Sequence, residues 1–200
     1  MICMKGTFVI IEGISGVGKT TTVKEATHIL DKPDTDIVYS KGFVKDSLWQ
    51  YIINTYPHSG TYYLDLAVQT ALRITPQLRK GKTVVQDRYV QTIDSFFPDC
   101  EWTHNRLFRK MLDPLFLKPD VYVHVTADIG EVTQRLSKFV EDDYRSSLVL
   151  HPERQVRREA KYREIFAELT CPKYVLDTSG KKPRDCAHEL IDILRGERLC

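Results

Sequence analysis

Short runs of apolar and β-branched residues alternate along the chain with longer stretches in which apolar residues recur every three or four positions. The short runs are typical of buried strands, and the longer stretches are typical of amphipathic helices. The runs predict five strands, over residues 7–11, 36–39, 83–86, 121–125 and 174–176. The stretches predict helices over residues 18–31, 44–55, 62–80, 103–117, 128–138, 149–169 and 183–195. This order predicts an α/β fold, a five-stranded parallel sheet flanked by helices on both faces.

The composition is that of an ordinary globular protein. Of the 200 residues, 42% are hydrophobic and 28% are charged, which excludes a wholly disordered or fibrous chain. We expect residues 1–200 to form a single domain. Basic residues outnumber acidic residues by 29 to 27, so the formal net charge is only +2. A nucleic-acid partner is therefore not expected, although a local basic pocket for phosphate groups remains compatible with this balance.

Cysteine use and hydropathy bear on the cellular compartment. The five cysteines are scattered and form no CxxC pair, so neither a disulfide framework nor a zinc site is expected. No apolar run approaches the roughly 20 residues that a membrane span needs. The first run, residues 8–11, stops at Glu12 and is interpreted as a strand rather than a signal peptide. We expect no membrane association and a cytoplasmic protein.

The strongest chemical signal lies between the first predicted strand and the first predicted helix. It is the segment Gly13-Ile14-Ser15-Gly16-Val17-Gly18-Lys19-Thr20, which satisfies the pattern G-x4-G-K-[ST]. Glycines let backbone N–H groups surround a phosphate, Lys19 can reach the β- and γ-oxygens, and the Thr20 hydroxyl can bind Mg²⁺. A plain glycine-rich turn would need neither the lysine nor the hydroxyl. We interpret residues 13–21, including Thr21, as an ATP-binding loop.

A second signal follows the third predicted strand, where Asp87 is followed directly by Arg88. Side chains at the carboxyl edge of a parallel sheet project into the crevice where α/β proteins bind ligands. Asp87 can hold a metal ion or its water, and Arg88 can grip a phosphate with its planar guanidinium. The alternative is a simple ion pair at the end of a strand.

A phosphate-binding loop alone does not distinguish kinases from GTPases or mechanical ATPases. The segment Asp177-Thr178-Ser179-Gly180 fits a GTPase D-x-x-G, but it follows the last predicted strand, and no Asn-Lys-x-Asp tetrapeptide occurs. The chain also lacks the long acidic strand typical of motor ATPases. These observations favour a kinase.

Several segments together resemble thymidylate kinases and the wider group of P-loop nucleotide and nucleoside kinases. They are Ile11-Glu12-Gly13, the loop through Thr21, Asp87-Arg88-Tyr89, Lys118-Pro119-Asp120 and Leu176-Asp177-Thr178-Ser179-Gly180. In order and spacing the resemblance covers roughly residues 5–195. It implies the P-loop nucleotide kinase fold, ATP and Mg²⁺ as cofactors, small nucleotides as substrates, and a homodimer.

The resemblance also implies roles for individual residues. Lys19, Asp87 and Arg88 would be catalytic, and Thr20 and Asp87 would bind Mg²⁺. The residues implied for acceptor binding are Glu12, Lys41, Gln69, Arg73 and Arg88. A lid over residues 138–148 would cover the donor phosphates with Arg135, Lys138 and Arg145.

Three departures leave the acceptor open. Ser15 replaces an acid of the thymidylate kinase loop, Gly42-Phe43-Val44-Lys45 replaces the usual continuation after Lys41, and Gln69 replaces a stacking phenylalanine. A glutamine there is expected in deoxynucleoside kinases, in which Glu12 would match the general base at a 5′-hydroxyl. Because Asp87-Arg88-Tyr89 is the form found in monophosphate kinases, the sequence favours dTMP as the acceptor. A deoxynucleoside kinase and a non-catalytic nucleotide-binding protein remain the alternatives.

One further helix pattern bears on phosphate binding. Arg154, Arg157, Arg158 and Lys161 are spaced so that they share one face of the helix predicted over residues 149–169. Such a stripe is usually a solvated surface unless a phosphate-bearing cleft lies opposite.

Overall fold

The computed structural model describes residues 6–30, 37–42, 59–96, 109–138 and 151–197. Five strands form one sheet in the order β2-β3-β1-β4-β5. Their bounds are β1 Phe8–Glu12, β2 Ile37–Lys41, β3 Thr83–Asp87, β4 Val121–Thr126 and β5 Lys173–Asp177. Every pair of neighbouring strands is parallel. The predicted parallel α/β sheet is thus confirmed, and each strand lies within two residues of its predicted bounds.

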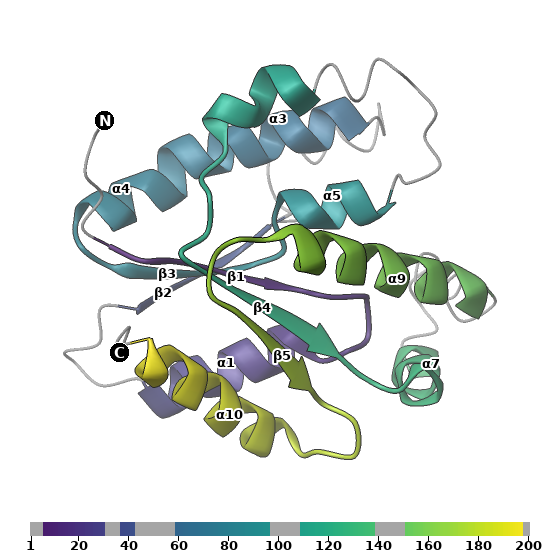
Figure 1. Cartoon of the computed structure of the whole chain (residues 1–200). Helices are drawn as coiled ribbons and strands as arrows, with labels where there is room; N and C mark the ends of the chain where they lie inside the picture. The colour runs from purple at the N-terminus through teal and green to yellow at the C-terminus, as the bar shows by residue number, and fades with distance from the viewer. Residues whose placement is uncertain (1–5, 31–36, 43–58, 97–108, 139–150, 198–200) are drawn as a thin grey trace.

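Helices cover both faces of this sheet (Figure 1). On one side lie α3 Ser59–Gln69, α4 Thr75–Arg79 and α5 Val90–Phe96, and on the other lie α1 Lys19–Leu30 and α10 Pro183–Gly196. Helix α9 Pro152–Glu168 runs beside α5 on the first side, and α7 Ile129–Ser137 lies near the end toward which the arrowhead of β4 points. The carboxyl end of β4 therefore points toward α7, and the first turn of α9 reaches the loop after β1 through Gln155.

Two apolar cores result from this layering. One joins strand residues such as Val9 and Val123 to α1, α7 and α10, and the other joins Phe8 and Ile10 to α3, α4 and α5. Because side chains alternate along a strand, Val9 and Ile10 of β1 enter opposite cores. Both faces of the central strand are buried, as the continuous apolar run over residues 8–11 requires.

The helix predicted over residues 62–80 contains an irregular turn. It is an almost unbroken helical segment from Ser59 to Arg79, but a π-helical turn, Thr70–Ile74, separates α3 from α4. Such turns occur frequently at functional sites. This one carries Arg73, a predicted acceptor-binding residue.

Other differences from the sequence expectation concern helices. Helix α5 was not predicted. Of the helix predicted over residues 103–117, residues 103–108 lie outside the described residues, residues 109–112 are helical, and a 3₁₀ turn, Asp113–Leu115, ends the helix before residue 117. The helix predicted over residues 44–55 lies outside the described residues. None of the helices that the structure describes combines the length and apolar character needed to cross a membrane.

Candidate functional site

The glycine-rich loop connects β1 to α1 and is held against the sheet by its own apolar residues. Ile14 and Val17 are buried in the core formed with α1, α7 and α10. Gly13 has a φ of 144°, and a Cβ at this position would lie 2.2 Å from the carbonyl oxygen of Val125. Only glycine fits between β1 and β4 there. The loop is therefore anchored on both sides before any ligand binds.

Lys19 is the buried first residue of α1. Its Nζ donates to the carbonyl oxygens of Gly13 and Ile14, each at 2.7 Å. Burial, reinforced by the nearby positive charge of Arg88, holds the pKa of Lys19 well below its usual range, against the opposing effect of Asp87 and Glu12. An anion placed beside Lys19 would stabilise its charged, ammonium form.

Asp87, the last residue of β3, meets the loop through Thr20. The Thr20 hydroxyl donates to Asp87 Oδ2 at 2.6 Å, and the Tyr39 hydroxyl donates to the same oxygen at 3.1 Å. Asp87 Oδ1 is buried and has no hydrogen-bond partner among the described residues. A carboxylate oxygen without a hydrogen-bond partner, beside a threonine hydroxyl, is suited to binding Mg²⁺. Proteins usually hold this ion by one or two carboxylates together with phosphate oxygens.

Arg88 has a backbone conformation that is rare for a residue with a side chain. Its φ is 73°, in the left-handed region, a strain worth about 1–3 kcal/mol. The backbone is held there because Arg88 N–H donates to Ile11 O at 3.1 Å, while Gln86 Nε2 donates to Arg88 O at 2.8 Å. In this position Arg88 Nη2 donates to the Ser15 hydroxyl at 3.2 Å. The strand end thus brings Arg88 to the glycine-rich loop.

Glu12 lies at the end of β1 and is fully buried. Its Oε1 accepts from the backbone N–H groups of Tyr89 and Thr92, at 2.7 and 3.1 Å. Its Oε2 accepts from the hydroxyl groups of Thr92 and Tyr162, at 2.6 and 3.1 Å. Burial raises the pKa of Glu12 although these bonds favour the carboxylate. Glu12 therefore caps the first turn of α5.

The predicted acceptor residues of the long helix gather around Asp65. Gln69 Nε2 donates to Asp65 Oδ2 at 2.8 Å, and Gln69 Oε1 is buried with no hydrogen-bond partner in the described part of the chain. Burial raises the pKa of Asp65, and the positive charge of Arg73 opposes that shift. Arg73 itself is exposed. Lys41 is also exposed and ends β2 in register with Asp87.

The loop after β5 packs on the glycine-rich loop. The Thr178 hydroxyl donates to Val17 O at 2.8 Å. Arg135, on α7, donates to the Thr178 hydroxyl at 3.0 Å and to the Thr178 carbonyl at 2.9 Å. Of the predicted lid residues, Arg135 thus lies beside the loop, Lys138 is exposed after α7, and Arg145 lies outside the described residues. The lid stays a prediction.

Helix α9 supplies contacts that the sequence analysis did not assign to the site. Gln155 Nε2 donates to the carbonyl oxygen of Ser15 at 3.1 Å. The predicted stripe of cations is divided, because Arg154 and Arg157 are exposed, Lys161 is half-buried and Arg158 is buried. Tyr39 was not predicted as a site residue, although its position near the end of a strand, two residues before Lys41, was a usable signal.

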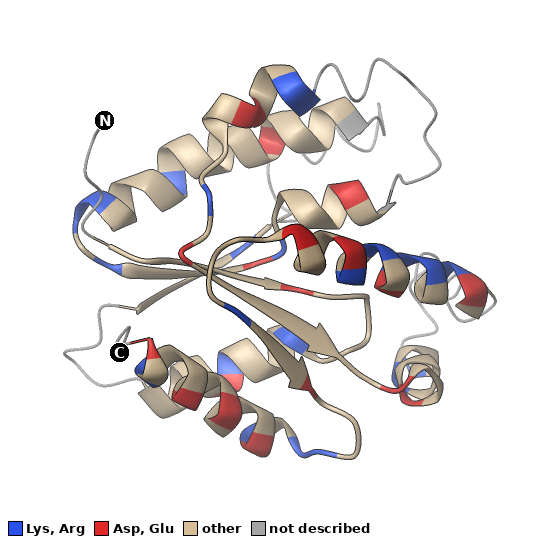
Figure 2. Cartoon of the chain, viewed as in Figure 1, with Lys and Arg blue, Asp and Glu red and all other residues tan. Residues whose placement is uncertain are grey.

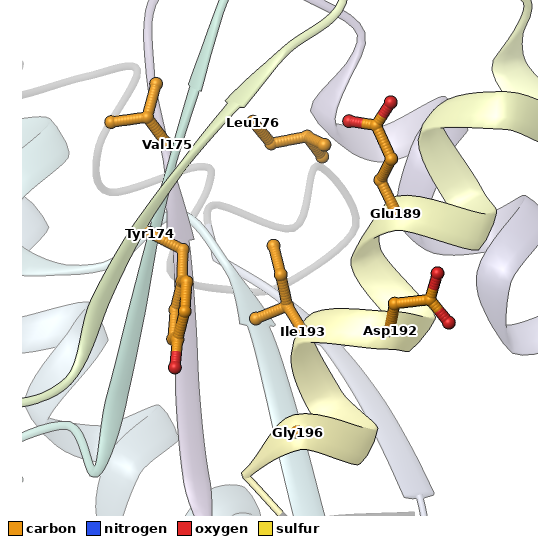
Figure 3. Close-up of a pocket in the computed structure, with 7 residues that line it drawn as sticks. All are labelled: Tyr174, Val175, Leu176, Glu189, Asp192, Ile193 and Gly196. Carbon is orange, nitrogen blue, oxygen red and sulfur yellow. The ribbon is translucent and has the colours of Figure 1, made fainter.

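A separate pocket of about 430 Å³ lies between the edge strand β5 and α10 (Figure 3). Its charged lining residues, Glu189 and Asp192, are both acidic. None of its lining residues in the described part of the chain is a lysine or arginine, so these residues do not suit a phosphate group. The candidate functional site is therefore the loop and strand ends around Lys19, Asp87 and Arg88.

Comparison with known proteins identifies relatives of part of the chain. No protein-family model matches it. A thymidylate kinase from Coprothermobacter proteolyticus is 31% identical over 91 residues, 42% of this chain and 47% of that protein. A thymidylate kinase from Pelotomaculum thermopropionicum is 29% identical over 100 residues, 44% of this chain and 46% of that protein. The matched region spans just under half the length of each relative.

A solved structure extends the likeness along the chain. The structure of thymidylate kinase from Candida albicans has a TM-score of 0.71 at 17% sequence identity, covering 97% of this chain and 93% of that one. At this identity the match establishes the fold, which is the P-loop fold that the sequence predicted. The chain is thus similar in sequence to thymidylate kinases over part of its length, and it shares the fold of a solved member of that family.

Proposed function

We propose that the chain is an ATP- and Mg²⁺-dependent kinase that transfers the γ-phosphoryl group of ATP to a nucleoside monophosphate, dTMP, giving ADP and dTDP. One observation carries the proposal: Arg88 follows the metal-compatible Asp87 and reaches Ser15 of the glycine-rich loop at 3.2 Å. A guanidinium between a donor loop and an acceptor crevice is suited to joining two phosphates. The partial similarity to curated thymidylate kinases supports dTMP as the acceptor.

In this proposal the protein acts by positioning and by neutralising charge. Backbone N–H groups of the loop and Lys19 hold the donor phosphates, and Asp87 and Thr20 hold Mg²⁺. When bound there, Mg²⁺ would offset part of the negative charge of the phosphates. Arg88 orients the acceptor phosphate. The bond between the γ-phosphorus and the β–γ bridging oxygen of ATP breaks as an oxygen of the acceptor phosphate bonds to that phosphorus, and the bridging oxygen leaves with ADP.

The surroundings of Glu12 favour a monophosphate over a nucleoside acceptor. A 5′-hydroxyl must lose a proton to a base, whereas a phosphate monoester, with a second pKa of about 6, is already anionic at neutral pH. Glu12 was the predicted base for a nucleoside. A carboxylate has about four lone-pair sites, and Glu12 accepts four hydrogen bonds from the protein. It has no acceptor site left for a substrate proton.

The orientation of Gln69 favours thymine or uracil as the base. An ionised carboxylate only accepts hydrogen bonds, so Asp65 holds the Gln69 amide with Nε2 toward itself. The acceptor Oε1 then remains available. It can accept from the N3–H of thymine, whereas N3 of cytosine is itself an acceptor. The lid and the homodimer complete the proposal as implications of the family resemblance, and the single domain over residues 1–200 is inferred from the length of the chain.

The test is ADP release from purified protein with ATP and Mg²⁺ across dTMP, dUMP, dCMP, AMP, GMP, thymidine and deoxycytidine. We expect turnover with dTMP, less with dCMP and none with nucleosides. In Asp65→Asn, the new side-chain NH₂ group can donate to Gln69 Oε1, which lets the Gln69 amide turn over. This variant should therefore show a smaller difference in turnover between dTMP and dCMP. Gln69→Phe should change the acceptor preference as well.

Two results would refute the proposal. Turnover with thymidine but not with dTMP would make the protein a nucleoside kinase. The general base would then be a residue other than Glu12, whose carboxylate already accepts four hydrogen bonds. ATP binding with no acceptor-dependent ADP would favour a nucleotide-binding protein that acts without catalysis.

A further inference from the structure

Gln86 is a polar residue inside the sheet. It lies on β3 in register with Ile10 of β1, and because side chains alternate along a strand it shares the face of Val84, toward the core formed with α3, α4 and α5. Its exposed fraction is 0%. Figure 2 shows that charged residues gather on the helices and that the strands carry few of them. Gln86 thus places an amide group in a mostly apolar layer.

One end of this amide lacks a partner. Its oxygen, Gln86 Oε1, is buried and has no hydrogen-bond partner among the residues that the structure describes. A buried acceptor without a donor costs free energy, whereas an apolar side chain of similar size would fill the same space without that cost. The benefit of a glutamine at this position therefore lies in its other amide atom, Nε2.

The Nε2 atom holds the backbone of Arg88. Gln86 Nε2 donates to Arg88 O at 2.8 Å, and at the other end of the same residue Arg88 N–H donates to Ile11 O at 3.1 Å. Arg88 has a φ of 73°, which residues with a side chain rarely adopt. The two bonds fix both ends of this strained residue, so Arg88 cannot return to an ordinary φ without breaking one of them.

The segment after β2 leaves room for the contact between Gln86 and Arg88. A Cβ on Gly42 would lie 2.6 Å from Arg88 O and 3.3 Å from Gln86 Nε2. A side chain at this position would therefore press on both partners of the bond. The absence of a side chain at Gly42 allows the Gln86 amide to reach the Arg88 carbonyl.

The backbone of Arg88 decides where its guanidinium lies. With this backbone, Arg88 Nη2 donates to the Ser15 hydroxyl of the glycine-rich loop at 3.2 Å. Because φ sets the direction in which the side chain leaves the backbone, a change of φ would swing the guanidinium away from the loop. A misplacement of about 1 Å is enough to weaken a site strongly.

We infer that Gln86 is a positioning residue for the acceptor, which holds the Arg88 backbone so that the guanidinium lies at the acceptor phosphate. The inference rests on the proposed kinase function, in which Arg88 orients that phosphate. The donor phosphates are held by the loop backbone and by Lys19, whose own contacts are with Gly13 and Ile14. Gln86 therefore controls the affinity for the acceptor and not the affinity for ATP.

The test is calorimetric titration of Gln86→Met and Gln86→Leu, which keep a side chain of similar size but remove the donor. The matched control is Gln134→Met, because Gln134 is an exposed glutamine of α7. dTMP is titrated without ATP, and ATP with Mg²⁺ is titrated without an acceptor. We expect both Gln86 variants to bind dTMP about tenfold more weakly and to bind ATP within about twofold of the wild type. Gln134→Met should match the wild type in both titrations.

A double-mutant cycle with Arg88→Met shows whether Gln86 acts through Arg88. Arg88→Met alone removes the guanidinium and should weaken dTMP binding by about tenfold or more. Adding Gln86→Met should weaken it by less than about a further twofold, because the group that Gln86 positions is gone. Additive losses would show that Gln86 acts by another route and would overturn the inference.

Three other results would also overturn it. Wild-type dTMP affinity in Gln86→Met, or equal losses of dTMP and ATP affinity, would mean that Gln86 does not act on the acceptor specifically. Thermal unfolding shows whether the variants fold. Loss of folding in both Gln86 variants would assign this glutamine to the core alone.

The same titrations separate this inference from the kinase function. A wild type that binds dTMP without transferring a phosphoryl group to it would refute the kinase function, and a selective loss of dTMP affinity in Gln86→Met would still support the inference. Turnover of dTMP together with wild-type affinities in Gln86→Met would refute the inference alone. No binding of dTMP by the wild type would refute both.

Discussion

The surroundings of Lys19 lower its pKa well below the usual value for a lysine. Its pKa is lowered by burial and then by Arg88, so the neutral amine forms at a lower pH than in an exposed lysine. Only the protonated form attracts phosphate. The affinity for ATP should therefore fall as the pH rises through this lowered pKa, over a range that lies below the ordinary pKa of lysine.

Lys19→Arg supplies the control, because arginine stays charged throughout this range. Calorimetric titration with ATP should give an affinity that declines with pH in the wild type and changes little in Lys19→Arg. Equal slopes for the two proteins would show that Lys19 does not titrate there. Lys19→Ala should lower kcat by at least about a hundredfold, as expected for losing one preorganised charge.

Glu12 gives a prediction about stability rather than chemistry. In Glu12→Gln, one carboxylate oxygen becomes an NH₂ group that faces hydrogen-bond donors, so part of a buried network of four bonds is lost. We expect the free energy of unfolding to fall by about 1–3 kcal/mol. Urea unfolding measures the change. The control is Glu164→Gln, whose side chain is 64% exposed and should change stability by less than about 0.5 kcal/mol; equal effects in both variants would contradict the capping account.

At the scale of elements, the close approach of the β2 and β3 ends positions Arg88. Gly42 N–H donates to Asp87 O at 2.9 Å, and a Cβ on Gly42 would lie 2.6 Å from Arg88 O. Gly42→Ala should therefore displace the strained Arg88 backbone and lower kcat by about tenfold or more, because small misplacements in a site are costly.

Gly196→Ala is the matched control for this substitution. A Cβ on Gly196, at the end of α10, would meet nothing within 4 Å. Steady-state kinetics should thus distinguish the two alanine variants. Wild-type kcat in Gly42→Ala would mean that the strand ends do not constrain Arg88.

The helices and strands also differ in how well the sequence predicts them. The strands of the sheet and the glycine-rich loop are local patterns, so their positions were predicted to within two residues. Helix α5 is only seven residues long, and its cap is Glu12, which lies 77 residues before Tyr89. The sequence near α5 contains no pattern that would predict a cap from a residue so far away in the chain. The burial of Arg158 likewise depends on where α9 packs, because helical spacing alone grouped it with the exposed Arg154 and Arg157.

For the whole molecule, the anchored loop predicts a measurable link between ligand binding and stability. Ile14 and Val17 are part of one core, and Thr178 joins the loop to the segment after β5. ATP with Mg²⁺ that binds only the folded state should raise the free energy of unfolding by about 2.7 kcal/mol at 100 times its Kd. For a chain of this length the melting temperature should rise by about 5 to 10 °C.

Removal of the metal ion tests whether Asp87 contributes to the stabilisation by ATP and Mg²⁺. A chelator should remove much of the ATP-dependent rise in melting temperature from the wild type. Asp87→Asn should show a smaller rise that the chelator changes little. An equal chelator effect in both proteins would assign the metal to other residues.

The central claim is that the site joins an ATP phosphoryl group to a nucleoside monophosphate. It is tested most directly by following a label on the γ-phosphate of ATP in the presence of dTMP and Mg²⁺. We predict that the label appears as the β-phosphate of dTDP, at a rate that Lys19→Ala lowers by at least about a hundredfold. Label found only in inorganic phosphate, or retained in ATP while dTMP stays unchanged, would contradict the account.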